Sequence, residues 1–199
     1  MLFDKLTNYK LKMRFNMSKI KIINSNWLKV LAMIFMLLDH MWATIIPGNQ
    51  WMTNVGRLAF PIFAFLIVEG FIHTSDLKKY IKRLFVFALI SEIPFNLIYT
   101  GSWIFPFHQN VLFTFILGLL CINEIDKIKN KRNLKSGIIG VLKILLFLLL
   151  GILGFVDYGI TGICTIIVFY IFRNFKLAWL GQVISLALLY IVFFKGQSI

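Results

Sequence analysis

The sequence predicts an all-α protein, a bundle of transmembrane helices with about seven membrane spans and a cytoplasmic N-terminus. Three observations predict this class: 59% of the 199 residues are hydrophobic, the mean hydropathy is +0.84, and only 15% of the residues are charged. A soluble core of this size cannot bury so much apolar surface, and a bilayer accepts it as helices whose backbone groups are all paired. The composition therefore excludes an ordinary soluble domain, a disordered chain and a secreted disulfide scaffold.

Two regions are expected along the chain. Residues 1–26 are polar and basic and should form a cytoplasmic tail, and residues 27–199 should form one transmembrane domain. No small-residue cleavage site follows the first apolar run, so we expect no removable signal peptide. Seven apolar segments are predicted to be the spans, and the second and fourth should extend into their flanks: 27–46, 58–73, 84–100, 111–123, 136–154, 159–172 and 177–194.

The basic residues predict the orientation of these spans. The formal net charge is +13, but Lys and Arg lie between the apolar segments rather than on one face of a domain, so no nucleic-acid partner is expected. With the N-terminus inside, all of the 21 basic residues except Arg57 and Lys195 fall on the cytoplasmic side. This asymmetry predicts a multi-pass protein of the bacterial plasma membrane, in contact with membrane lipid.

The first segment carries ionisable residues, which are unexpected in a membrane span because a charge inside a bilayer costs roughly 2.5–3.5 kcal/mol. Lys29 and His40 share one face of a helix and lie about 16 Å apart along its axis. Asp39 is rotated about 100° from His40, so its partner is expected on another helix. One interpretation of the Asp39–His40 pair is a structural network of hydrogen bonds between helices. The acid next to the histidine favours the other interpretation, a functional role for the pair.

The other segments carry further candidate polar residues. Arg57 either pairs with Asp39 or extends to lipid head groups. Glu69 and His73, one helical turn apart, form either a salt link at a helix end or part of a cytoplasmic mouth. Asp157 either caps the sixth segment or joins a polar path through the protein. The remaining candidates for such a path are Glu92, Asn110 and Thr114.

Several kinds of site are not indicated by any motif. There is no glycine-rich phosphate loop, so the chain is not expected to drive transport with ATP on its own. No His, Asp or Glu set has the spacing of a metal site, and there is no Gly-x-Ser-x-Gly elbow. Cys121 and Cys164 stand in apolar surroundings and are interpreted as small core residues. His108 is interpreted as a solvated loop residue.

The segments that carry these residues resemble the TraX family, which is named for a conjugative-plasmid protein that acetylates the amino terminus of pilin. The resemblance extends over residues 27 to about 190, and its most specific parts are the first two blocks. The blocks that carry it are 28–40, 56–65, 68–74, 91–95, 110–114 and 157–160.

A more distant similarity connects the chain with two larger families. Acyltransferase-3 proteins have a basic residue, ten intervening residues and an essential histidine on their first helix. Lys29 and His40 keep that spacing, with Lys in the place where Arg is usual and without the planar fork of Arg. The Phe-Pro block at residues 60–65 is similar to the second-helix motif of heparan glucosaminide N-acetyltransferases.

The resemblance implies acetyl transfer across the membrane from cytoplasmic acetyl-CoA, with no metal. The expected acceptor is an amine or hydroxyl of an extracytoplasmic protein or glycan, such as a pilin N-terminus. His40 would be the general base, with Asp39 and Arg57 shaping the field around it. The residues expected to bind acetyl-CoA or the acceptor are Lys29, Arg57, Glu69, His73, Glu92, Asn110, Thr114 and Asp157, with Asn110 or Thr114 polarising the thioester carbonyl.

Two alternatives from other functional classes stay open. One is a small proton-coupled transporter in which Asp39, Glu69 and Glu92 form a relay. The other is a non-catalytic assembly factor for a surface structure, which would tolerate the loss of His40.

Overall fold

The computed structural model describes residues 25–131, 133–173, 180, 182, 183 and 187. These residues contain no strand, and one isolated parallel bridge joins Gln109 to Val156. The all-α class is therefore confirmed. The helices are α2 (Ser25–Thr44), α3 (Gln50–Gly56), α4 (Ala59–His73), α5 (Leu77–Thr100), α6 (Val111–Lys131), α7 (Leu134–Leu153) and α8 (Gly159–Phe172).

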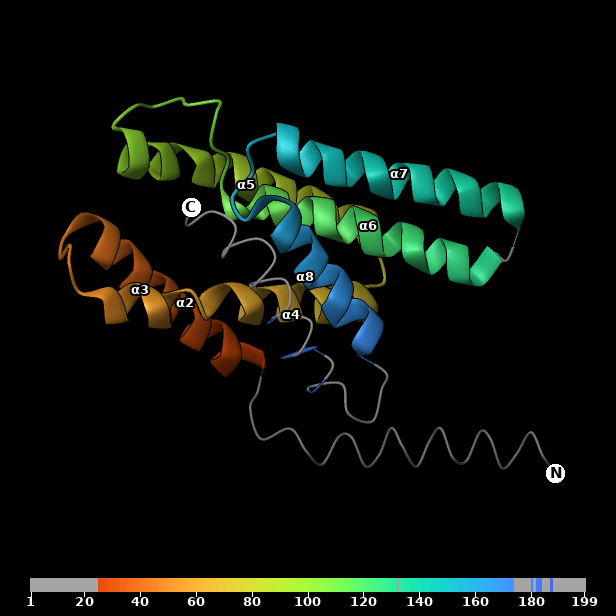
Figure 1. Ribbon diagram of the computed structural model, residues 1–199, viewed down its shortest axis with the longest axis horizontal. Coiled ribbons are helices and arrows are strands. Elements are labelled where there is room, and N and C mark those ends of the chain that lie inside the picture. Colours follow the sequence, from red (N-terminus) through yellow and green to blue (C-terminus); the bar gives the residue numbers. More distant parts are fainter. Residues whose placement is uncertain (1–24, 132, 174–179, 181, 184–186, 188–199) are drawn as a thin grey trace.

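The helices run back and forth, so their ends gather at two ends of the bundle (Figure 1). The loops after α2, α5 and α7 lie at what we call the His40 end, and the loops after α4 and α6 lie at the Glu69 end. Asp76 caps α5 by accepting a hydrogen bond from the backbone N–H of Lys79 at 3.0 Å. Gly101, with φ of +68°, ends the same helix at the opposite end of the bundle.

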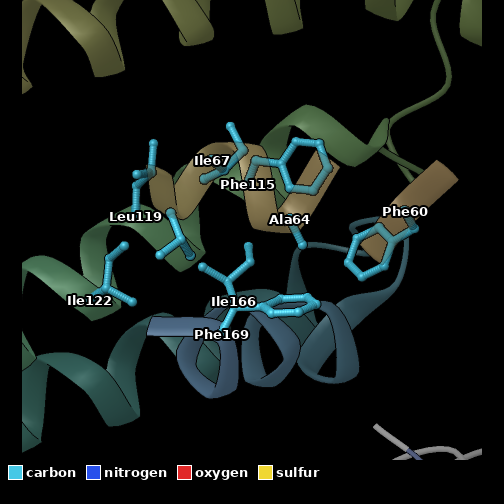
Figure 2. Close-up of a cluster of buried hydrophobic side chains, with 9 residues drawn as sticks. Phe60, Ala64, Ile67, Phe115, Leu119, Ile122, Ile166 and Phe169 are labelled. Atoms are coloured by element: carbon cyan, nitrogen blue, oxygen red, sulfur yellow. The ribbon is translucent and has the colours of Figure 1, made fainter. Parts of the chain in front are cut away.

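The core lies between α4, α6 and α8, as Figure 2 shows. Ala64 of α4, Leu119 of α6 and Ile166 of α8 are each fully buried there. A Cβ at Gly162 of α8 would stand 2.6 Å from the Cγ2 atom of Thr114, so only glycine permits this approach of α8 to α6. This packing brings the loops of the His40 end together.

The predicted number of spans is too high for the described residues. By length and composition, three helical stretches can cross a membrane: α2, the stretch Gln50–His73 and α7, whereas the apolar α8 has only 14 residues. α5 and α6 are not in this set, and in α6 the charged residues that begin at Glu124 leave an apolar stretch too short to cross a membrane. The expected extension of the second segment toward its N-terminal flank is confirmed.

Two predicted regions cannot be compared with the structure. Residues 1–24 of the predicted tail and most of the seventh segment, 177–194, lie outside the described residues.

Candidate functional site

Asp39 is held by the helix that follows its own. Its Oδ1 atom accepts a 2.7 Å hydrogen bond from the hydroxyl of Thr53, a residue of α3 that is only 2% exposed. A Cβ at Gly56 would lie 2.6 Å from the Cβ of Asp39, so α3 presses directly on α2 at this point. The expectation of a partner on another helix is thus confirmed. Arg57 is exposed, and it forms no ion pair with Asp39 among the described residues.

His40 has a ring nitrogen that is not engaged by the protein. The residue is half-buried, and its Nδ1 atom is buried with no hydrogen-bond partner in the described structure. Its ring meets the ring of Tyr99 on α5 edge-on, with centroids 6.3 Å apart. An imidazole nitrogen left free in this way has a lone pair or a proton to offer to a bound molecule.

Tyr99 connects two histidines that come from different parts of the chain. Its ring lies 5.7 Å from the ring of His108, in the loop between α5 and α6, and 4.8 Å from the ring of Phe95. His108 also contacts Phe95 at 5.1 Å. The interpretation of His108 as a solvated loop residue is therefore incomplete, since it is half-buried against this aromatic face. The spacing of Phe95 and Tyr99, one turn apart on α5, was the only sequence signal for such a face.

Asp157 is brought near His40 and His108 by the pairing of two loops. The backbone N–H of Gln109 donates to the carbonyl of Phe155, and that of Asp157 donates to the carbonyl of Gln109, both at 2.9 Å. Burial raises the pKa of the Asp157 carboxyl, and the electrostatic influence of the His108 and His40 side chains opposes that rise. The loop pairing therefore places Asp157 within electrostatic reach of both histidines.

The prediction that Asp157 caps the next helix is wrong by one residue. Tyr158 is the N-cap of α8, with φ of +61°, and its backbone N–H donates to Oδ1 of Asp157 at 3.0 Å. The left-handed conformation at Tyr158 and at Gly159 turns the chain before the helix begins, so the Asp157 side chain cannot reach the first turn of α8.

Asn110 and Thr114 use their donors inside the protein. The Asn110 amide donates to Oε2 of Glu92 at 2.6 Å and to the carbonyl of Ala88 at 2.9 Å. The Thr114 hydroxyl, which is fully buried, donates to the carbonyl of Asp157. Both residues therefore join helices and loops here, and neither offers a free donor to a thioester carbonyl in this structure.

The Glu69 end of the bundle contains paired charges. Arg173 donates to Glu69 from two nitrogens, at 2.7 Å and 3.3 Å, which joins the end of α8 to α4. The Nδ1 atom of His73 lies 2.9 Å from the backbone carbonyl of Glu69 and 3.7 Å from its carboxylate. The geometry favours the helix-end link for Glu69 and His73. Arg173 lies 104 residues from Glu69 in the chain, so no local spacing predicts that the two residues pair.

Three further expectations concern residues away from these clusters. Lys29 is exposed in the second turn of α2, toward the Glu69 end. Cys121 and Cys164 are free thiols. Among the described residues, no group of three or more His, Cys, Asp or Glu side chains has the arrangement of a metal site.

The comparisons with known proteins identify a family for the chain. A family model described as TraX protein matches residues 24–197. The probable fimbrial assembly protein FimC, serogroup H1, of Dichelobacter nodosus is 37% identical over 112 residues, which cover 48% of this chain and 43% of that protein. The match thus spans less than half of the length of this curated relative. No solved structure matches the chain significantly.

Proposed function

This chain belongs to the TraX family, and from that premise we propose that it is a membrane-bound acetyltransferase. It transfers the acetyl group of cytoplasmic acetyl-CoA to an amine or hydroxyl of an acceptor on the other side of a bacterial plasma membrane. A pilin N-terminus and a surface glycan are the acceptors that this chemistry fits. The name of the relative, which concerns fimbrial assembly, supports a surface structure as the destination.

The observation that carries the proposal is the free ring nitrogen of His40. Nδ1 is buried and has no hydrogen-bond partner in the described structure. The adjacent residue Asp39 accepts a hydrogen bond from Thr53 of the neighbouring helix α3. In the proposed reaction His40 takes the proton from the acceptor N–H or O–H as that atom attacks the thioester carbonyl. The tetrahedral intermediate then expels the CoA thiolate, which receives the proton. General base catalysis of this kind contributes about 10²–10⁴ to the rate.

Tyr99 is the donor that we propose for the developing oxyanion. The residue is 45% exposed, and its ring packs against both His40 and His108. It replaces Asn110 and Thr114 in this role, since their donors are occupied by Glu92 and by the Asp157 carbonyl. A preorganised donor at the carbonyl oxygen stabilises the transition state without later reorganisation.

The two substrates would approach from opposite ends of the bundle. Lys29 and the basic residues at 78–83 lie at the Glu69 end, where the negative phosphates of CoA would meet positive charge. The acceptor would approach the His40 end, where Arg57 is exposed.

The test compares the purified wild-type protein in detergent with His40→Ala, using radiolabelled acetyl-CoA. Asn54→Ala is the matched control, because Asn54 is exposed on α3 at the same end of the bundle. We expect label transfer or slow hydrolysis in the wild type and the control, and at least a 100-fold loss in His40→Ala. Thermal unfolding with and without CoA shows that all three proteins fold and bind the cofactor. Full transfer by a folded His40→Ala protein would refute the role of His40.

A non-catalytic assembly factor is the second candidate function. The printed name of the Dichelobacter nodosus relative favours it, since assembly is all that the name states. Such a factor neither binds CoA nor hydrolyses acetyl-CoA, so both assays separate it from the enzyme. The proton-coupled transporter gains less support, because Arg173 neutralises Glu69, one of the three carboxylates of its relay.

A further inference from the structure

Two side-chain oxygens of α5 are buried without a hydrogen-bond partner in the described structure. They are Oε1 of Glu92 and Oδ1 of Asn96, and Asn96 is only 2% exposed. Both atoms are hydrogen-bond acceptors when Glu92 is ionised, so neither can satisfy the other. Buried acceptors are rarely left unpaired, least of all in a helix of a membrane protein.

The two residues stand four positions apart on one helix. Side chains with this spacing lie on the same face, one turn from each other, and can form a hydrogen bond when one is a donor. Tyr99, three positions beyond Asn96, continues this face to the ring of His40. The unpaired oxygens therefore belong to a polar stripe of α5 that runs from Glu92 toward His40.

Glu92 also lacks a countercharge. Glu69, Glu124 and Asp76 each have a Lys or Arg side chain within 4 Å, whereas the contacts of Glu92 in the described structure are neutral. It receives only the side-chain and backbone donors of Asn110, the residue just before α6, and these bind its other oxygen, Oε2. On α5 itself, the polar neighbours of Glu92 along this face are Asn96 and Tyr99. A negative charge held in this way would be poorly compensated in an apolar bundle.

We propose that Glu92 binds a proton and donates it, through Oε1, to Oδ1 of Asn96. A single proton then satisfies both unpaired oxygens and removes the uncompensated charge. Rotation of the Asn96 amide by 180° would also pair the two side chains, but it would leave the negative charge in place. The proton site does not depend on the acetyltransferase proposal, and it puts an acid on the stripe that ends at His40.

Infrared spectroscopy of the purified protein at neutral pH tests this site, because the carbonyl stretch of a carboxylic acid is separate from the bands of a carboxylate. The chain has three glutamates, and the other two, Glu69 and Glu124, are ion-paired. Labelling the glutamate carboxyl groups with ¹³C should therefore shift an acid band that arises from Glu92. Glu92→Gln should remove this band while keeping an N–H donor for Asn96, and Asn96→Leu should shift it.

The control variant is Asp157→Asn, which removes a carboxyl group from the paired loops of the His40 end and leaves all three glutamates in place. The glutamate band should persist in this variant. An acid band that does not respond to glutamate labelling, or the absence of any acid band, would overturn the proposal and favour an ionised Glu92 with a rotated Asn96 amide. The labelled wild type decides the question even if Glu92→Gln does not fold.

Discussion

The two ends of the bundle treat their acidic residues in opposite ways. At the Glu69 end, basic side chains neutralise Glu69 and Glu124, with the shortest N–O distances at 2.7 Å and 2.6 Å. At the His40 end and in the C-terminal half of α5, the acids are Asp39, Glu92 and Asp157. In the described structure these three accept hydrogen bonds from neutral groups only, and no Lys or Arg pairs with them.

This difference separates acids that are neutralised by a basic side chain from acids that are held by neutral donors. An ion pair such as Glu69–Arg173 joins two helices, and its two charges neutralise each other. Neutral donors such as Thr53 fix the position of Asp39 without cancelling its charge, so its field still acts on the adjacent His40. Clusters of acids and histidines arranged in this way are typical of functional sites. This difference between the two ends supports the proposal that the chemistry takes place at the His40 end.

The largest effect on stability is expected from Gly56→Val, which disrupts the contact between α3 and α2 at the His40 end. The new side chain would start 2.6 Å from the Cβ of Asp39 and force α3 away from α2. We expect a loss of about 3 kcal/mol in stability, measured by thermal unfolding in detergent, together with loss of the proposed acetyl transfer. Gly137→Ala on α7 is the control, since nothing lies within 4 Å of its added Cβ, and it should keep or raise stability. Equal effects of the two variants would contradict the tight contact at Asp39.

Arg173→Ala tests the Glu69 end and should cost about 2 kcal/mol. The variant leaves the partly buried Glu69 carboxylate without its two donors, so the loss comes mainly from the unpaired charge. Glu69→Gln in the same chain should recover part of the loss, because it removes that charge. A double-mutant cycle from thermal unfolding measures this coupling. Strictly additive effects would show that the pair contributes nothing to stability.

The smallest effect is expected from Asp76→Ala, which removes the cap of α5. The backbone N–H of Lys79 that donates to Asp76 lowers the pKa of this carboxyl below its ordinary value. The charged cap therefore contributes fully at neutral pH, and its contribution is lost as the pH falls through the lowered pKa. The melting temperature of the wild type should exceed that of Asp76→Ala at neutral pH and approach it in acid. A difference that does not change with pH would argue against a charged cap.

Residues close together in the sequence were the ones whose environment could be predicted. The periodicity of α2 placed Asp39 away from His40, and Asp39 indeed finds its partner on another helix, although that partner is Thr53 rather than Arg57. The basic residues predicted that Lys143 lies toward the Glu69 end, where it stands 3.7 Å from Glu124. Local spacing and charge counts are sufficient for such statements, because they depend on one helix at a time.

Contacts between distant segments were not accessible in this way. Nothing in the sequence connects Glu69 with Arg173, or His108 with the aromatic face of α5, because each contact depends on how two helices or loops pack. The number of spans was overestimated for a related reason. Hydropathy detected the apolar parts of α6 and α8, but α6 continues into charged turns from Glu124 onward and α8 has only 14 residues.

The sequence by itself determined that this protein is helical, apolar and membrane-associated, and it singled out His40 and Asp39 as residues that lipid alone would not tolerate. These properties follow from composition and from periodicity within single helices. Only the tertiary structure decided which acids are neutralised and which are left available. The reason is that a charge is paired or free according to the side chains within about 4 Å of it, and those come from helices far apart in the chain.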